Sequence, residues 1–194
     1  MRRVPGVLGV SEVRSLPTMT SAVSQVFARA PETASTLQID AETHLVDSAF
    51  FSATRLPVRM LSGDGVVQWR SGDDGVVLSE SAGRALGGRE GRYPSCVSVG
   101  GAETKCRNII GIASDANFIG GDRSSAFAIY ELISNEGDET AGLLVRSYES
   151  PAVVQAVIQA EVGLSAADHS PMVVRSVRAE LTGVNAPWRD GLHL

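Results

Sequence analysis

Residues 56–79 read LPVRMLSGDGVVQWRSGDDGVVLS, and this stretch decides the fold class that we predict. Asp-Gly occurs twice in it and supplies the positive φ angles that tight hairpin turns need. We therefore expect a three-stranded antiparallel meander. Pro57 cannot donate a hydrogen bond to a ladder, so the first strand should lie at a sheet edge. The three expected strands are 56–61, 66–70 and 75–79.

Further β-rich segments flank this stretch on both sides. Leu37 and Ile39 alternate with polar neighbours, which indicates a half-buried strand that begins near residue 35. A polar turn at 135–139 makes 141–148 the expected hairpin partner of 126–133. The other expected strands are 96–99, 108–113 and 172–181.

Two helices are expected. Val23, Val26 and Phe27 recur at helical spacing, so we predict a short helix from Thr20 to Ala30. Ser150 is a good N-cap, and Pro151 suits the first helical position because its missing N–H is not needed there. That second helix should end at Gly163. Long loops are expected at 79–95 and 114–124.

These elements predict a mainly β chain, an antiparallel β-sandwich or barrel, with jelly-roll topology as one form of it. Strands do not alternate regularly with helices, which argues against a parallel doubly wound sheet. We divide the chain into an extended N-terminal arm with a short helix (1–33), a β-rich domain (34–182) and a C-terminal tail (183–194).

Composition excludes several classes of protein. The chain has 194 residues, 43% of them hydrophobic and 20% charged, which is typical of a globular domain. No apolar run approaches the roughly 20 residues that span a bilayer. The net charge of -5 argues against a surface that coats nucleic acid. Residues 1–30 nevertheless carry four arginines and one glutamate, so a weakly basic segment precedes an acidic body.

Neither cysteine nor histidine indicates a metal or redox centre. The spacing of Cys96 and Cys106 could close a small loop, but it matches neither a CxxC redox motif nor a zinc motif, so we expect reduced thiols in a cytoplasmic setting. His44, His169 and His193 form no ligand motif and give few candidate bases for a catalytic triad. We therefore expect no resident cofactor and no metal.

Arginine supplies the remaining candidate contacts. The glycine-rich region 83–91 is accompanied by three arginines, and backbone N–H groups together with guanidinium groups can hold an anion. These candidate anion contacts are Arg84, Arg89 and Arg92.

An extended N-terminal arm, such as the one expected here, often becomes ordered on a neighbouring subunit. The candidate contacts of the arm with a second copy are Arg2, Arg3 and Arg14.

The first functional hypothesis is a structural, self-assembling subunit without catalytic activity, such as a viral coat or phage particle protein. Its partners would be copies of itself, with weak nucleic-acid contact through the arm and no membrane contact, in a virion or the cytoplasm. The alternative is a small β-barrel enzyme or ligand-binding protein whose site lies in the barrel mouth and uses the loops at 83–91 and 114–124. A third hypothesis is a bacterial regulatory or interaction module that catalyses no reaction.

Overall fold

The computed structural model describes seven segments of the chain, residues 6–14, 22–29, 36–61, 74–87, 93–116, 127–133 and 142–163. Strands predominate in them, which confirms the mainly β prediction. The strands are β1 (Val7–Val13), β2 (Ala22–Arg29), β3 (Thr36–Val46), β4 (Val58–Met60), β5 (Val76–Ser79), β6 (Cys96–Val99), β7 (Arg107–Ala113), β8 (Ala128–Leu132) and β9 (Gly142–Ser147). The helices are α1 (Phe50–Thr54), α2 (Glu80–Ala85) and α3 (Pro151–Gly163).

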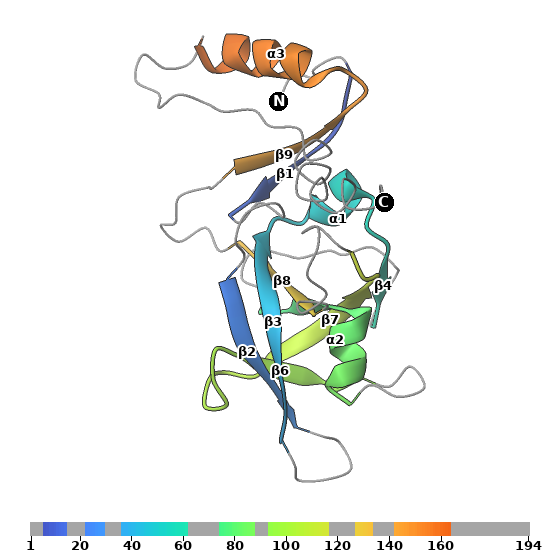
Figure 1. The fold of residues 1–194 in the computed structure, drawn as a ribbon, viewed down its shortest axis with the longest axis vertical. Helices are drawn as coiled ribbons and strands as arrows, with labels where there is room; N and C mark the ends of the chain where they lie inside the picture. The colour runs from blue at the N-terminus through green and yellow to red at the C-terminus, as the bar shows by residue number, and fades with distance from the viewer. Residues whose placement is uncertain are drawn as a thin grey trace, which may run out of the picture.

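A closed barrel forms the lower half of the molecule in Figure 1. Its six strands follow the order β2–β6–β7–β5–β8–β3, and β3 pairs back with β2 to close the ring. The barrel prediction is thus confirmed, although two of the six strand pairs are parallel. These are β5 with β7 and β3 with β8, whereas the other four pairs are antiparallel.

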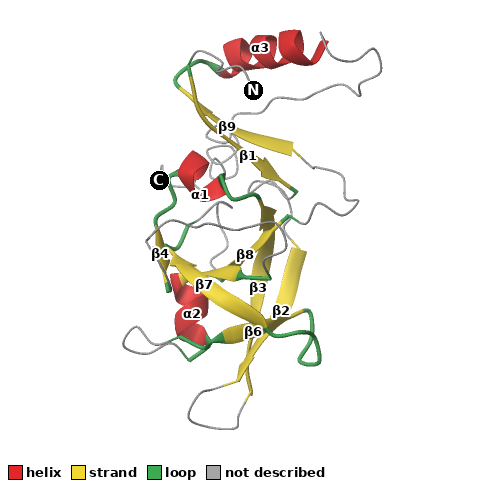
Figure 2. Cartoon of the chain, turned by 180° about the vertical axis from the view of Figure 1, so that it is seen from behind, coloured by secondary structure: helices red, strands yellow, loops and turns green. Residues whose placement is uncertain are grey.

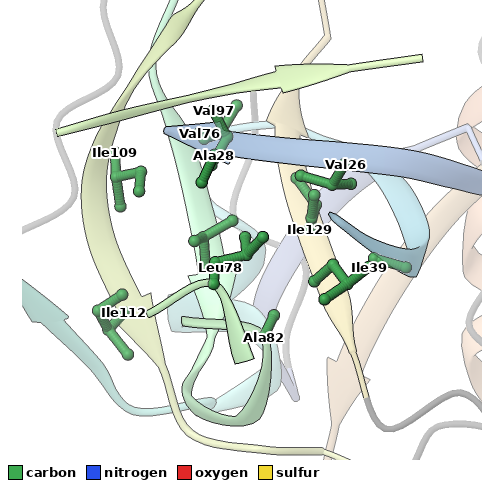
Figure 3. Close-up of a cluster of buried hydrophobic side chains, with 12 residues drawn as sticks. Val26, Ala28, Ile39, Val76, Leu78, Ala82, Val97, Ile109, Ile112 and Ile129 are labelled. Atoms are coloured by element: carbon green, nitrogen blue, oxygen red, sulfur yellow. The ribbon is translucent and has the colours of Figure 1, made fainter. Parts of the chain in front are cut away.

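Apolar side chains fill the interior of this barrel (Figure 3). Alternation along the strands turns every second residue inward, as with Val76 and Leu78 on β5. Helix α2 follows β5 directly and contributes Ala82 to the same cluster, and Leu86 just after the helix joins it. The other buried members are Val26, Ala28, Ile39, Ala41, Val97, Ile109, Ile112 and Ile129. We call this set the barrel core.

A second layer packs on the outside of the barrel. Strands β1 and β9 pair antiparallel as a ribbon, and α1 lies between this ribbon and the barrel (Figures 1 and 2). We call β1, β9 and α1 the ribbon layer. A separate cluster joins it to the barrel, with Val13, Phe50 and Phe51 on one side and Val77 and Tyr130 on the other.

The helix expected from Thr20 to Ala30 is wrong, because Ala22–Arg29 form strand β2. This strand pairs with β3 along its whole length. Of the expected apolar face only Val26 belongs to the barrel core, together with Ala28 two residues on, as in a strand, while Val23 is 64% exposed. Tertiary pairing therefore overrides the helical spacing of the apolar residues.

The expected meander is also wrong. Strand β5 pairs with β7 along one edge and with β8 along the other, so no edge of β5 is left for the expected middle strand, and β4 pairs with β7. The middle piece, 66–70, lies outside the described residues. Among the described strands β4 pairs with β7 alone, which agrees with the edge position predicted from Pro57. A distant partner, rather than the next strand along the chain, organises this region.

The hairpin between 126–133 and 141–148 is wrong for the same reason. Strand β8 pairs with β3 and β5, whereas β9 pairs with β1. The prediction of α3 is confirmed, and the amide of Val153 donates to Ser150 Oγ at 3.4 Å. Helices α1 and α2 were not expected, and α2 occupies part of the predicted loop 79–95.

Some predictions remain untested. The strand expected at 172–181, the turn at 135–139 and the tail at 183–194 all lie outside the described residues. The division into arm, body and tail stays a prediction. Within the stretch 1–30, β1 and β2 both pair with strands of their own chain.

Candidate functional site

The barrel offers no open chamber in the part of the chain that the structure describes. Helix α2 packs against the barrel core at the end of the barrel where β5 stops. At the other end Arg107 forms an ion pair with Glu131, which lies opposite Val76, the first residue of β5. Because side chains fill the space between these ends, the expected site in the barrel mouth is not supported by the described residues.

One surface pocket, of about 220 Å³, lies where α2 begins. Its walls come from β4, the end of β7 and the first residue of α2. The lining residues are Pro57, Val58, Arg59, Glu80, Ile112, Ala113 and Ser114. Arg59 donates to the hydroxyl of Tyr93 at 3.1 Å, and its guanidinium lies 5.5 Å from the centre of that ring. The pocket wall is therefore held by contacts within the protein.

Side chains around the start of α2 are paired with one another. Asp115 accepts hydrogen bonds from the amide and the hydroxyl of Ser81, both at 2.8 Å. Arg84 pairs with Glu80 at 3.2 Å and with Asp115 at 3.5 Å. The Arg84 guanidinium thus faces two carboxylates. Arg89 and Arg92 lie outside the described residues, so the anion site stays a prediction.

Gly83, which the sequence placed in a glycine-rich loop, is a helical residue of α2. A Cβ atom at this position would lie 2.7 Å from Cε1 of Tyr93. The glycine therefore allows the close packing of helix and ring, which is a role in packing rather than in holding an anion. No pattern in the sequence pointed to Tyr93 as this neighbour.

A buried polar group lies on the outside of the barrel, on the face of β3 that also carries Val46. His44 is 2% exposed, and its Nε2 lies 3.6 Å from a carboxylate oxygen of Glu42. The imidazole stacks on the ring of Tyr130 with 5.4 Å between centroids. Burial lowers the pKa of His44, and the nearby Glu42 opposes that shift. Burial also raises the pKa of Tyr130, so its hydroxyl stays protonated.

Asp47, immediately after β3, ties the ribbon layer to the barrel. Its carboxylate accepts from the Ser11 hydroxyl at 2.7 Å and from the Glu12 amide at 3.0 Å. It also accepts from the Ala49 amide, at 3.0 Å, just before α1 begins. One carboxylate therefore fixes β1, β3 and α1 relative to one another. Sequence reasoning missed this residue, because a single aspartate carries no motif.

The face of the ribbon that points away from the barrel is mostly apolar, with Glu12 as its charged member, opposite Leu143. The inner face is identified by Gly9, where a Cβ atom would lie 3.1 Å from Cα of Ala53 in α1. Alternation then turns Val10 outward, and its partner Val145 shares that face. Leu143 lies on the same face and is 50% exposed, and Leu8 is 38% exposed. We call Leu8, Val10, Leu143 and Val145 the outer ribbon face.

Arg146 lies on the inner face of β9. Its guanidinium donates to the carbonyl oxygen of Ser52 in α1 at 3.0 Å. Positive charge is thereby turned inward, and no charged residue of β9 lies on the outer ribbon face. Arg14, one of the residues expected to contact a second copy, follows β1, and its amide donates to the carbonyl oxygen of Leu45 at 3.0 Å. Arg2 and Arg3 lie outside the described residues, so their contact with another copy stays a prediction.

Cys96 and Cys106 form a disulfide, so the expectation of reduced thiols is wrong. The antiparallel pairing of β6 with β7 brings the two residues together, with Cys96 opposite Asn108. The bridge closes the connection between these two barrel strands. Next to it, Lys105 pairs with Asp74, and this contact lowers the pKa of that carboxyl.

No group of three or more His, Cys, Asp or Glu side chains is placed to hold a metal ion among the described residues. The helices found in those same segments are too short or too polar to cross a membrane. His169 and His193 lie outside them.

Comparison with known proteins gives a likeness of fold. No family model matches the chain, and no curated protein matches it. The crystal structure of the periplasmic region of MacB from Actinobacillus actinomycetemcomitans is similar at a TM-score of 0.54 and 13% identity, over 94% of this chain and 78% of that one. The extracellular domain of the noncanonic ABC-type transporter YknZ from Gram-positive bacteria aligns at a TM-score of 0.46 and 15% identity, over 82% and 79%. Because the sequence identity to MacB is only 13%, this structural similarity establishes a shared fold and nothing more.

The expectation of a viral coat or phage particle subunit is wrong. The solved structure that shares the fold, the periplasmic region of MacB, is not a coat protein. The strand pairing gives the physical reason why this expectation fails. The expectation relied on an N-terminal arm that stays free to lie across a neighbour, but β1 and β2 are used in pairing within the chain itself.

Proposed function

We propose that this chain is an extracytoplasmic domain of a membrane transporter assembly, and that it works by contacting other proteins rather than by catalysing a reaction. The disulfide between Cys96 and Cys106 is the observation that carries the proposal, because such bonds persist in oxidising compartments and are rare in the cytosol. The fold shared with the periplasmic region of MacB supports the same compartment and suggests the kind of assembly.

The filled barrel supports a role in contact rather than in chemistry. A ligand-binding barrel keeps space inside for its ligand, whereas here α2 and the barrel core occupy that space. The outer ribbon face supplies a surface that a partner can cover, since Leu143 and Leu8 are exposed there together. The proposal therefore places the contact with the assembly on the ribbon layer.

The compartment is tested by the oxidation state of the cysteines in the native cell. Thiols are alkylated before lysis, and the mass of the protein shows how many cysteines reacted. We expect no reaction until the protein is reduced, and then reaction of both Cys96 and Cys106. The double variant Cys96→Ser, Cys106→Ser is the control for labelling elsewhere. Cysteines that react without reduction would contradict an extracytoplasmic location.

The contact is tested with a photo-crosslinking amino acid placed at position 143 in the full chain, in native cells. We expect a covalent adduct with an integral membrane transport protein, identified by mass spectrometry. Position 40 is the matched control, because Asp40 is exposed on β3, away from the outer ribbon face. No such adduct from 143, or equal adducts from 143 and 40, would contradict a contact through the outer ribbon face.

A further inference from the structure

Strand β9 is an edge strand of the ribbon. Among the described strands it pairs with β1 alone, and its other edge lies on the side of β9 that is away from β1 and the barrel (Figure 1). Backbone groups on such an edge have no partner within the sheet, so the edge can take up a further strand. This open edge consists of backbone groups and is distinct from the outer ribbon face, which consists of side chains.

The hydrogen bonds of β1 show which backbone groups of β9 point to the open edge. The carbonyl oxygen of Glu12 accepts a backbone hydrogen bond from the residue after β3, so Glu12 turns its backbone groups towards β3. Since backbone groups alternate along a strand, Ser11 turns its own towards β9, where Leu144 lies opposite it. Leu143 and Val145, on either side of Leu144, therefore turn their N–H and C=O groups to the open edge.

Strand β4 also has a single neighbour among the described strands, but its edge is protected and that of β9 is not. Proteins protect open edges with short strands, prolines and charged side chains. Strand β4 has three residues, follows Pro57 and carries Arg59 at its centre. Strand β9 has six residues, no proline and one charged residue, Arg146. That charge does not protect the edge, because Arg146 lies on the inner face and donates to Ser52 of α1.

The side chains beside the open edge are apolar on the outer side of the ribbon. Leu143 is 50% exposed, and Val145 lies on the same side of the strand. Glu12, the charged residue on that side, lies on β1 and so one strand away from the edge. A second strand of the same sequence therefore brings apolar side chains together across the new pair.

A second copy of the chain is the partner that these features fit. Two identical edges pair antiparallel about a twofold axis, so the donors of each edge meet the acceptors of the other. A two-stranded ribbon is marginal by itself, and two ribbons joined in this way form a sheet of four strands. Each copy has one unprotected edge among its described strands, so the pairing closes at two copies.

We propose that β9 pairs with β9 of a second copy, so that two ribbon layers join into one continuous sheet. The pairing uses the backbone edge of β9, whereas the contact with a transport protein uses the outer ribbon face. An adduct from position 143 with a transport protein is expected whether or not the chain dimerises. The two proposals can therefore fail separately.

Light scattering of the full chain, at concentrations from about 1 µM to about 1 mM, tests the proposal. A contact between two short strands is small, so we expect a dimer that dissociates on dilution. The mass should rise with concentration from 20.4 kDa, that of one chain, towards twice this value. A mass that stays at one chain throughout, or that rises beyond two chains, would overturn the proposal.

Variants on two neighbouring strands distinguish the edge from the face. Val145→Pro removes an N–H that points away from β1, so each dimer loses two hydrogen bonds and should form about tenfold more weakly. Val145→Lys keeps the backbone and adds a charge at the edge, so it should also weaken the dimer and serves if the proline variant does not fold. Val10→Lys is the matched control, because Val10 lies opposite Val145 but on β1, and it should change dimerisation less than about threefold.

Amide exchange locates the pairing within the dimer. The amides of Leu143 and Val145 should exchange about tenfold more slowly in concentrated than in dilute protein, whereas the amide of Leu144, which points to β1, should exchange equally in both. Protection of Leu143 and Val145 in the monomer would show that the chain itself covers this edge, and the proposal would be wrong. It is also overturned if Val10→Lys weakens the dimer as strongly as the two variants at position 145.

Discussion

The barrel and the ribbon layer solve the same problem, burying one face of a sheet, in different ways. Six barrel strands close on themselves, so each has a neighbour on both sides and the apolar face points into a common interior. The ribbon has two strands, which are marginal alone, and it relies on α1 and the outer wall of the barrel for cover. Closure makes the barrel self-sufficient, whereas the ribbon depends on the barrel.

This difference between the barrel and the ribbon layer affects where polar groups and exposed apolar side chains lie in the molecule. The ion pair of Arg107 and Glu131 lies at one end of the barrel. The contact between the layers contains Asp47, whose carboxylate accepts hydrogen bonds from Ser11 and Glu12 of β1. An exposed apolar face also belongs to the ribbon layer. Stability is therefore expected mainly from the barrel, and contact with other proteins from the ribbon.

The largest expected effect is from truncation in the barrel core. Leu78 is fully buried there, and Leu78→Ala should lower the free energy of unfolding by about 3 kcal/mol, since both transfer energy and packing are lost. The matched variant Leu143→Ala, on a side chain that is 50% exposed, should cost less than about 0.5 kcal/mol. Urea unfolding measures both. Similar losses would mean that the barrel and the ribbon do not differ as described.

Removing the disulfide should have the next largest effect. The bridge joins residues that are 10 apart in the sequence, and replacing both cysteines by serine should cost about 2–3 kcal/mol because the unfolded chain gains freedom. Urea unfolding of the double variant checks this. The wild-type protein in excess reductant should show the same shift, and an unchanged midpoint in both would contradict the prediction.

Asp47→Asn should produce a smaller loss that is concentrated in the ribbon layer. An amide replaces a carboxylate that accepts three hydrogen bonds, so we expect a loss of about 1–2 kcal/mol. Amide exchange should rise in β1 and α1 more than in β5. Asp40→Asn, at an exposed position, is the control and should leave both unchanged. A rise in amide exchange that is equal in the ribbon layer and the barrel would contradict the distinction between the two layers.

The smallest expected effect is at the α2 end of the barrel. Ser79 Oγ accepts from the Ala82 amide as N-cap of α2 and from the Ala128 amide of β8, at 3.3 and 3.0 Å. Ser79→Ala should cost about 1 kcal/mol, typical of a lost cap. Thermal unfolding measures the loss, with Ser52→Ala, an exposed position in α1, as reference. A loss no greater than that of Ser52→Ala would show that the cap does not stabilise the barrel end.

Local patterns predicted several elements well. The strands near 37–46, 96–99, 108–113 and 126–133 and the helix after Ser150 are all present. In each case the pattern extends over enough residues, or the cap is specific enough, for one local structure to be favoured. Helix α2 was missed because a run of small residues with glycine resembles a loop, and the structure stabilises it through the Ser79 cap, Ala82 in the barrel core and the packing of Gly83 on Tyr93.

The candidate site could not be predicted in the same way. Asp47 and Tyr130 carry no motif, and their importance comes from partners that are distant in sequence, such as Ser11 and His44. The disulfide was open as a geometric option, but composition favoured free thiols. The pairing of β6 with β7 brings the two cysteines close enough to form the disulfide.

The sequence alone determined that this chain is mainly β, where most strands lie, and that its surface is acidic, because these properties depend on composition and on alternation over a few residues. Only the tertiary structure decided which strands are neighbours, that β2 is not a helix, and that β1 and β9 form a separate layer. Strand pairing joins residues far apart in the chain. Its free energy comes from closing the barrel as a whole, which no local pattern records.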